Sequence, residues 1–316
     1  AYSTVPTPLY PLYADVDHFG APTTTLIFAS YAVGVILSLY LAGHVSDWLG
    51  RRRILVAAAL VAAASAVLFL LSPAVPVLLI ARLVNGCSIG ILTATATAHL
   101  GELRATAKPN EPAMIAASVA GAANLGGLAL GPLIGGLFAE YLPLPLILPH
   151  AVFLGLLLLA AVTARFVPET VTRPDPAPRW RPQHVSAPGD SMAKFAVTAL
   201  AAFSAFGVFG LFTSLAPSYL VSTFGVTDHF IAGVTSFTVF GAAAAGQVAL
   251  VRLSARHQLT IAGVSCALGL SAVGAGALTA LLPLFLAGWL IAGVGVGLLF
   301  RASLQATVAL APPGRR

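Results

Sequence analysis

Charged residues are scarce in this chain, and their scarcity excludes a water-soluble fold. Only 8% of the 316 residues are Asp, Glu, Lys or Arg, whereas soluble domains carry about 25%. Hydrophobic residues make up 58%, and the mean hydropathy is +0.94. So few charges cannot cover the surface of a soluble protein of this length. We therefore expect an all-α membrane protein in a lipid bilayer.

Cysteine is nearly absent, and no pattern of metal ligands is present. The two cysteines, Cys87 and Cys266, both lie inside apolar runs and give no disulfide framework. There is no zinc spacing, no His/Asp/Glu cluster and no phosphate-binding glycine loop. We therefore expect no enzyme activity, no cofactor and no metal. The basic residues are scattered among loops, so the net charge of +6 does not indicate nucleic acid.

Nine apolar runs are long enough to cross a bilayer, and a partial run ends near Pro11. A spanning helix needs about 20 apolar residues. The predicted spans are 21–44, 53–72, 75–99, 112–139, 144–167, 193–220, 229–252, 258–282 and 283–308. Because the chain begins without Met and stops after an apolar run, we expect it to be truncated at both ends.

The distribution of basic residues predicts the orientation in the membrane. If the loop 43–53 faces the cytoplasm, 13 of the 16 Lys and Arg lie in or beside loops on that side. The external loops then hold no Lys or Arg, as the positive-inside rule requires. We expect a multi-pass protein of the plasma (inner) membrane, with this loop and the segment 168–192 in the cytoplasm.

The segment 168–192 is rich in Pro and Arg, and it separates two similar halves. Gly86-x-x-x-Gly90 in the fourth span has a counterpart, Gly293-x-x-x-Gly297, in the tenth. Two parallel copies of a six-helix unit are typical of secondary transporters. We predict an N-terminal bundle over 1–167, with its first span incomplete. The C-terminal bundle over 193–316 then holds four of its six spans.

The loop between the second and third spans is the densest in charge, and its spacing resembles that of the major facilitator superfamily. The matching residues are Gly43, Asp47, Gly50, Arg51, Arg52 and Arg53. The resemblance implies a twelve-helix fold of two six-helix bundles. It also implies a conformational latch, in which Asp47 accepts hydrogen bonds from an arginine or a helix N-terminus of a neighbouring segment. The alternative is that the arginines only anchor the loop. Leu250 replaces the acid in the second copy, so a latch there is degenerate.

The fourth span carries Arg82, followed by Asn85, Gly86 and Gly90, and resembles the family's arginine-glycine pattern. In proton-coupled relatives this arginine is linked to proton transfer. An arginine inside a membrane usually faces a partner or a water-filled cavity. The alternative is that it snorkels to the external interface. No Asp or Glu lies in the middle of a predicted span, so proton coupling relies on Arg82 or on spans absent from this chain.

The fifth span contains a stripe of glycines around a proline. These residues are Gly127, Gly131, Pro132, Gly135 and Gly136. Glycines four residues apart let a neighbouring helix approach closely. Their order also resembles the pattern of superfamily antiporters, chiefly exporters. A weaker resemblance is Val167-Pro168-Glu169-Thr170, which closes the sixth span as in many members.

The candidate substrate-pocket residues are Asn85, Asn124, Phe206, Phe209 and Trp289. The two phenylalanines belong to a set that recurs every third residue of the seventh span, and such a set lines an apolar pocket or packs a core. Trp289 occupies the place of Arg82 in the second copy and stacks on a substrate or on neighbouring side chains. The asparagines serve as ligands or join helices.

Together these patterns favour a monomeric secondary transporter that works by alternating access. We expect proton-coupled export of small apolar or cationic compounds, with the bilayer, the substrate and protons as partners. Two alternatives stay open. One is a symporter that takes up a sugar, an organic acid or another metabolite, and the other is a receptor or sensor that does not transport.

Overall fold

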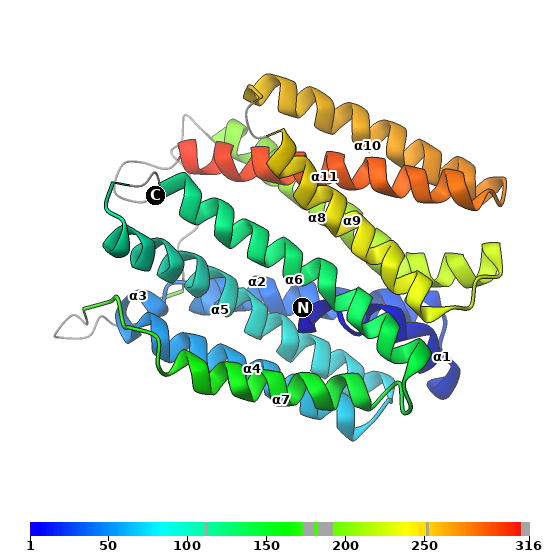
Figure 1. Cartoon of the computed structure of the whole chain (residues 1–316), viewed down its shortest axis with the longest axis horizontal. Coiled ribbons are helices and arrows are strands. Elements are labelled where there is room, and N and C mark those ends of the chain that lie inside the picture. The colour runs from blue at the N-terminus through cyan, green and yellow to red at the C-terminus, as the bar shows by residue number, and fades with distance from the viewer. Residues whose placement is uncertain (111–112, 173–179, 183–191, 251–252, 311–316) are drawn as a thin grey trace. The chain divides into compact units, whose positions relative to one another are not determined.

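A computed structural model describes the whole chain except residues 111–112, 173–179, 183–191, 251–252 and 311–316. The described residues form helices and no strand (Figure 1). Two 3-10 turns, η1 and η2, cover Tyr2–Thr4 and Thr7–Leu9. The helices are α1 Tyr10–Asp17, α2 Ala21–Ala42, α3 Ser46–Leu49, α4 Arg51–Leu71, α5 Val75–Ala107, α6 Ala113–Tyr141, α7 Leu148–Ala164, α8 Met192–Phe224, α9 His229–Ala249, α10 Ala255–Leu278 and α11 Leu282–Leu310.

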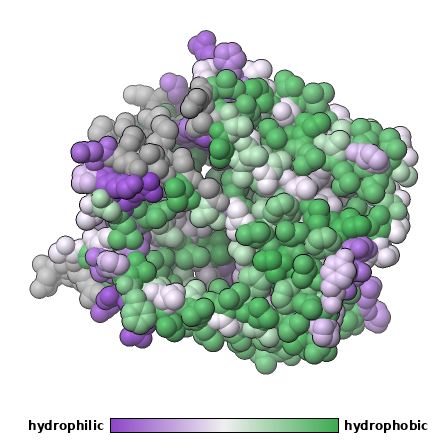
Figure 2. All heavy atoms as spheres, viewed as in Figure 1, coloured by the Kyte–Doolittle hydropathy of each residue, from purple (hydrophilic) through white to green (hydrophobic). Residues whose placement is uncertain are grey.

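Eight of the described helices are long and apolar enough to cross a membrane, and α7 is a shorter apolar helix. The prediction of an all-α membrane fold is therefore confirmed. Hydrophobic residues dominate the visible face, and hydrophilic residues gather toward the helix ends (Figure 2). One predicted boundary is wrong. The partial first span was expected to end near Pro11, but α1 begins at Tyr10 and continues to Asp17. Pro11 lies in the first turn of α1, where a missing N–H breaks no helical hydrogen bond.

The chain forms two compact units. The first consists of residues 2–124 and 138–184, and the second of residues 125–137 and 185–316. Most of the predicted linker 168–192 lies outside the described residues, so the predicted division into bundles stays a prediction.

In the first unit α2 and α5 cross at glycines. A Cβ on Gly86 of α5 would collide with the carbonyl oxygen of Tyr31, and a Cβ on Gly34 of α2 would collide with that of Leu83. Close approach of two backbones increases van der Waals contact, which drives helix association in lipid. α4 packs against α5 through alanines, and Ser65 of α4 donates a hydrogen bond to the Ala81 carbonyl oxygen at 2.8 Å.

In the second unit α11 lies in the core and contacts α8, α9 and α10. Its Gly293 approaches the Val239 carbonyl oxygen of α9 so closely that a Cβ would lie 2.7 Å from it, and Gly297 approaches Ala243 in the same way. The glycine pair of the tenth span therefore has the packing role of the pair in the fourth span. This equivalence supports the internal repeat that the sequence indicates.

Candidate functional site

The loop between α2 and α4 is shaped by Gly50, which separates α3 from α4. Its φ of +103° is a conformation that residues with a side chain rarely adopt. A Cβ at this position would also lie 2.5 Å from a carboxylate oxygen of Glu169. The backbone conformation therefore requires glycine here, and the absence of a side chain leaves room for the Glu169 carboxylate.

Arg51 is the centre of a polar cluster at this loop. Its side chain is only 9% exposed. Nη1 donates to Ser46 Oγ at 2.6 Å and to Asp47 Oδ1 at 2.5 Å, and Nη2 donates to Glu102 Oε1 of α5 at 2.8 Å. Arg51 thus ties the loop to α5. Asp47 takes its hydrogen bond from its own loop, whereas the prediction placed its partner on a neighbouring segment.

Glu169, in the segment after α7, caps the N-terminus of α4. Its carboxylate accepts hydrogen bonds from the backbone N–H groups of Arg51 at 2.8 Å and Arg52 at 3.2 Å. Partial burial opposes ionisation, but these N–H groups and those of Thr170 and Val171 prevail and lower the pKa of Glu169 below its ordinary value. A negative charge at this position also interacts favourably with the dipole of α4.

Thr170 contacts both Glu169, through its backbone N–H at 3.1 Å, and Glu102. Its hydroxyl donates to Glu102 Oε2 at 2.5 Å, and its Oγ1 lies 3.0 Å from His99 Nδ1. We call Asp47, Arg51, Glu102, Glu169 and Thr170 the arginine-loop cluster. Sequence reasoning missed the role of Glu102 entirely and treated Glu169 only as a closing pattern. The sequence did carry a signal for Glu102: it is an acid only three residues beyond the predicted end of the fourth span, on the same side of the membrane as the arginine loop.

Among the described residues, the side chains of the other two loop arginines form no ion pair. The salt bridges found among the described residues join Arg51 to Asp47 and to Glu102, and neither involves Arg52 or Arg53. The side chain of Arg53 is exposed. The three consecutive arginines therefore differ in role: the side chain of Arg51 pairs with two acids of the cluster, and Arg52 contacts Glu169 through its backbone N–H.

Arg82 lies inside the first unit and is 1% exposed, so its guanidinium does not snorkel to an interface. Nη1 donates to the carbonyl oxygen of Ser3 at 2.6 Å. The guanidinium carbon lies over the ring of Tyr31 at 4.6 Å and over that of Phe28 at 5.3 Å from each centroid. Both rings contribute cation–π stabilisation.

Several polar atoms near this arginine are buried without a hydrogen-bond partner. They are Arg82 Nε, both amide atoms of Asn85, the Tyr10 hydroxyl and Ser3 Oγ. The Tyr10 hydroxyl lies beside the Arg82 guanidinium. Buried polar atoms are normally paired, because leaving them unpaired costs about 1–3 kcal/mol each. Among the predicted pocket residues, Asn85 therefore has free hydrogen-bonding capacity in the interior of the first unit, and the buried indole N–H of Trp289 is likewise without a partner in the second.

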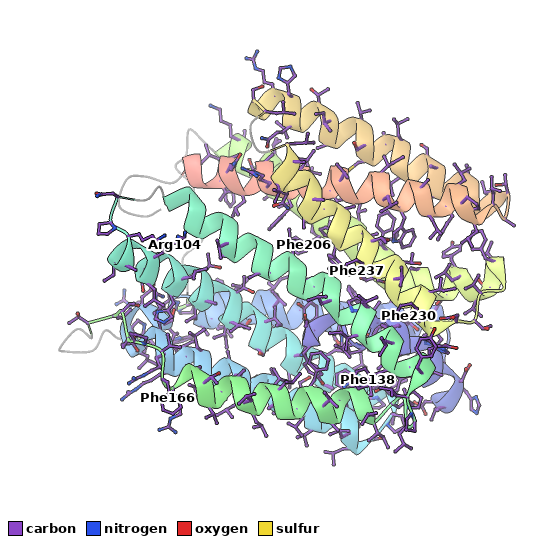
Figure 3. All side chains as sticks on the ribbon, in the orientation of Figure 1. Arg104, Phe138, Phe166, Phe206, Phe230 and Phe237 are labelled. Atoms are coloured by element: carbon purple, nitrogen blue, oxygen red, sulfur yellow. The ribbon has the colours of Figure 1, made fainter. Side chains whose placement is uncertain are left out.

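The remaining pocket candidates divide into core and surface. Phe209 is buried and stacks on Phe240 with centroids 4.8 Å apart, and Trp289 stacks on Phe212 at 4.3 Å. Phe206 on α8, labelled in Figure 3, is 55% exposed. Asn124 is also exposed. Phe209 and Trp289 therefore pack the core of the second unit, which was the alternative to a pocket.

The glycines of α6 pack against α9 within the second unit. A Cβ on Gly136 would lie 2.5 Å from the carbonyl oxygen of His229, and a Cβ on Gly233 would collide with that of Pro132. The neighbours Gly131 and Gly135 are buried, and Gly127 is partly buried. Close helix packing accounts for Gly136, and the meaning of the whole stripe for antiport stays a prediction.

One short stretch of α5 has the spacing of a hydrolase nucleophile. Gly86-Cys87-Ser88-Ile89-Gly90 lies in the middle of the helix rather than at a turn after a strand. The hydroxyl of Ser88 is buried and donates to the Ala58 carbonyl oxygen at 2.8 Å. Within the described part of the chain, no group of three His, Cys, Asp or Glu side chains is placed to hold a metal ion.

The profile of the Major Facilitator Superfamily matches residues 2–316. The chain belongs to this superfamily. Among solved structures, the xylose transporter XylE from E. coli has a TM-score of 0.71 at 18% identity. That match covers 98% of this chain and 81% of XylE.

Two curated relatives come from Bacillus subtilis (strain 168). Multidrug resistance protein 2 is 26% identical over 161 residues, which are 51% of this chain and 38% of that protein. The arabinose-proton symporter is 36% identical over 77 residues, which are 24% of this chain and 17% of the symporter. The chain thus spans only part of the relatives it matches. It is a multi-pass membrane protein of a transporter superfamily whose members act on small molecules within the bilayer, and not an enzyme.

Proposed function

We propose that the chain is a proton-coupled secondary transporter that exports small, largely apolar compounds by alternating access. The observation that carries the proposal is the arginine-loop cluster, in which one buried arginine joins the loop to α5 while Glu169 holds the start of α4. Charge-assisted hydrogen bonds of this kind are about twice as strong as neutral ones. The cluster therefore stabilises one arrangement of four segments, as a latch must.

Asp47 is the part of the latch that is open to a further partner. Its side chain is 58% exposed although it is paired with Arg51. Arg51 holds the carboxylate in place, and the exposed face is free to accept an N–H donor when segments rearrange. Breaking that contact allows the opposite conformation in our proposal.

Orientation and coupling follow from the distribution of charge. We place the arginine loop and the segment 168–192 in the cytoplasm of a plasma (inner) membrane protein, on the positive-inside rule. Arg82 is the proposed proton-coupling residue, because it is a buried cation. Movement of a proton near it would change its electrostatic interactions and so favour a different arrangement of the groups around it. The proposed export direction rests on the glycine stripe of α6 and on the similarity to multidrug resistance protein 2.

Uptake by symport is the second candidate. The similarity to the arabinose-proton symporter favours it, as do the unpaired polar atoms of Tyr10 and Asn85 in the interior. The sequence also predicted cationic substrates. A buried arginine without an acidic neighbour among the described residues gives a positive charge no favourable position beside it.

The test is transport in inverted membrane vesicles that contain the full chain. N-phenylnaphthylamine, a neutral apolar dye, should accumulate when an inward-acid proton gradient is imposed. A protonophore should abolish the accumulation, and vesicles without the protein provide the baseline. Gradient-driven movement of arabinose or xylose without movement of the dye would replace export with uptake. Movement of neither would remove the proposal.

A further inference from the structure

The guanidinium of Arg82 has unused hydrogen-bonding capacity in an interior where charge is costly. It carries five N–H donors, of which Nη1 meets the Ser3 carbonyl oxygen and Nε meets no acceptor. None of the salt bridges among the described residues includes it. A buried cation in a membrane protein normally has a counter-charge. An anionic ligand would supply one.

The neutral polar groups nearby are also available to a ligand. Asn85 lies three residues after Arg82 on α5, which places both on one face of the helix. Its amide has no partner, and the hydroxyl of Tyr10 faces the Arg82 guanidinium; both side chains are fully buried. The guanidinium, the amide NH₂ and the hydroxyl are three sets of donors. A carboxylate has two acceptor oxygens that suit such a set.

Two aromatic rings flank the guanidinium and indicate what the rest of the ligand is. The rings of Phe28 and Tyr31 lie 6.3 Å apart at their centroids and both face Arg82. Flat apolar groups pack well against such rings. A second positive charge beside Arg82 would be repelled, since none of the salt bridges among the described residues neutralises Arg82.

From this geometry we propose that Arg82, Asn85 and Tyr10 form a subsite for the carboxylate of a small aromatic acid. The inference rests on the proposed function and narrows its substrate class from apolar compounds in general to monoanionic ones. Arg82 provides charge and orientation, and Tyr10 and Asn85 complete the hydrogen bonds to the two carboxylate oxygens.

The test compares three probes that share one ring. Benzoate, benzamide and benzyltrimethylammonium present an anion, a neutral amide and a cation, and calorimetry measures their binding to the full chain in detergent at pH 7. We expect benzoate to bind at least about tenfold more tightly than the others, the scale of one charge-assisted hydrogen bond. Arg82→Gln should abolish this preference.

Two further variants keep the result interpretable if Arg82→Gln does not fold. Tyr10→Phe removes only a hydroxyl and should weaken benzoate binding about threefold without changing benzamide binding. Arg301→Gln is the matched control, because Arg301 also lies in a long apolar helix but donates to the Gln247 carbonyl oxygen at 2.7 Å. It should keep the preference for benzoate.

The proposal is overturned if benzoate does not bind, if the cation binds as well, or if both Arg82→Gln and Tyr10→Phe keep the wild-type preference. Failure here is distinct from failure of the proposed function. If the dye is transported but benzoate is not preferred, the proposed transport function stands and the proposed carboxylate subsite is rejected. If benzoate is preferred but no gradient-driven transport occurs, the carboxylate subsite stands and the proposed transport function is rejected.

Discussion

Arg82 on α5 and Trp289 on α11 occupy equivalent positions of the internal repeat, and both are buried. In the first unit this position holds a charge with unpaired polar atoms around it. In the second it holds an indole that stacks on Phe212 and lies 4.9 Å from the ring of Phe285. The first position carries a charged group with several donors, whereas the second carries a neutral ring system whose single N–H is buried without a partner.

The helix crossings of the two units are alike even though their interiors differ. Gly86 lets α5 approach α2, and Gly293 and Gly297 let α11 approach α9. Glycine is required in both places because a backbone carbonyl occupies the position of the missing Cβ. Packing is thus shared between the copies, while the chemistry of their interiors is not.

The loops that follow α2 and α9 show a second contrast. In the first unit an arginine of the loop reaches an acid on α5. In the second unit Leu250 stands where the acid would be, and Arg301 of α11 donates to a carbonyl oxygen at the end of α9. A cation at a helix C-terminus is favourable, so this contact joins α11 to α9 with fewer charges than join the start of α4 to α5 in the first unit.

The largest effect is expected when a charge is placed in the interior of the second unit, at the position equivalent to Arg82. Trp289→Arg buries a guanidinium among aromatic rings, and we expect a loss of about 3–5 kcal/mol, enough to prevent stable purification. Trp289→Phe keeps an aromatic ring and should lose much less. Thermal unfolding in detergent measures both. Near-wild-type stability of Trp289→Arg would mean that the two interiors are interchangeable.

The shared crossings are tested by paired substitutions. Gly86→Val and Gly293→Val each force a side chain into a backbone carbonyl, and we expect each to cost about 1–3 kcal/mol. Gly101→Ala is the control, because a Cβ there meets no atom within 4 Å. Unfolding temperatures of the three variants decide the point. If only one of the valine variants is destabilised, the packing is not equivalent.

The cap on α4 predicts a pH dependence confined to the first unit. Glu169→Gln should cost about 1 kcal/mol at neutral pH, because it removes a charged acceptor from a helix N-terminus. The pKa of Glu169 is lowered on folding, so its contribution is complete well above the ordinary value of 4.5 and is lost as the pH falls through the folded-state pKa. The unfolding temperatures of wild type and variant should therefore converge in acid.

The matched control for that series is Asp15→Asn, which removes an exposed carboxylate from α1. It should leave the pH profile unchanged. A constant difference between Glu169→Gln and wild type down to strongly acidic pH would show that the charge of Glu169 does not stabilise α4.

The smallest effect on stability is expected for Asp47→Ala. The carboxylate is more than half exposed, and such ion pairs contribute about 0–1 kcal/mol. Gradient-driven dye transport should nevertheless fall sharply, since the proposed latch loses its exposed acceptor. Expression and unfolding temperature serve as controls. Transport at the wild-type rate would reduce the loop to a topological anchor.

The helices were predictable because a bilayer core demands long apolar runs, and nine such runs coincide with α2, α4 to α11. The partners of the loop were not. Glu102 and Glu169 are 51 and 118 residues from Arg51, and only folding brings them together. The partner of Arg82 is a backbone carbonyl oxygen, which no residue pattern marks.

The aromatic positions show a different limit of sequence reasoning. A phenylalanine every third residue is compatible with lipid contact, a pocket or a core. Phe206 is exposed and Phe209 is buried although both obey the same spacing. Whether such a residue is buried depends on which helices pack beside it. The spacing of phenylalanines along one helix does not predict that packing.

Glu169 has a mechanical consequence as well as an electrostatic one. It binds the first two N–H groups of α4, and Thr170 beside it binds Glu102 of α5. These residues lie just before the segment through which the chain continues to the second unit. A movement of the chain directly after Thr170 would therefore act on the start of α4 through Glu169 and on α5 through Thr170, so one short stretch links both helices to whatever follows it.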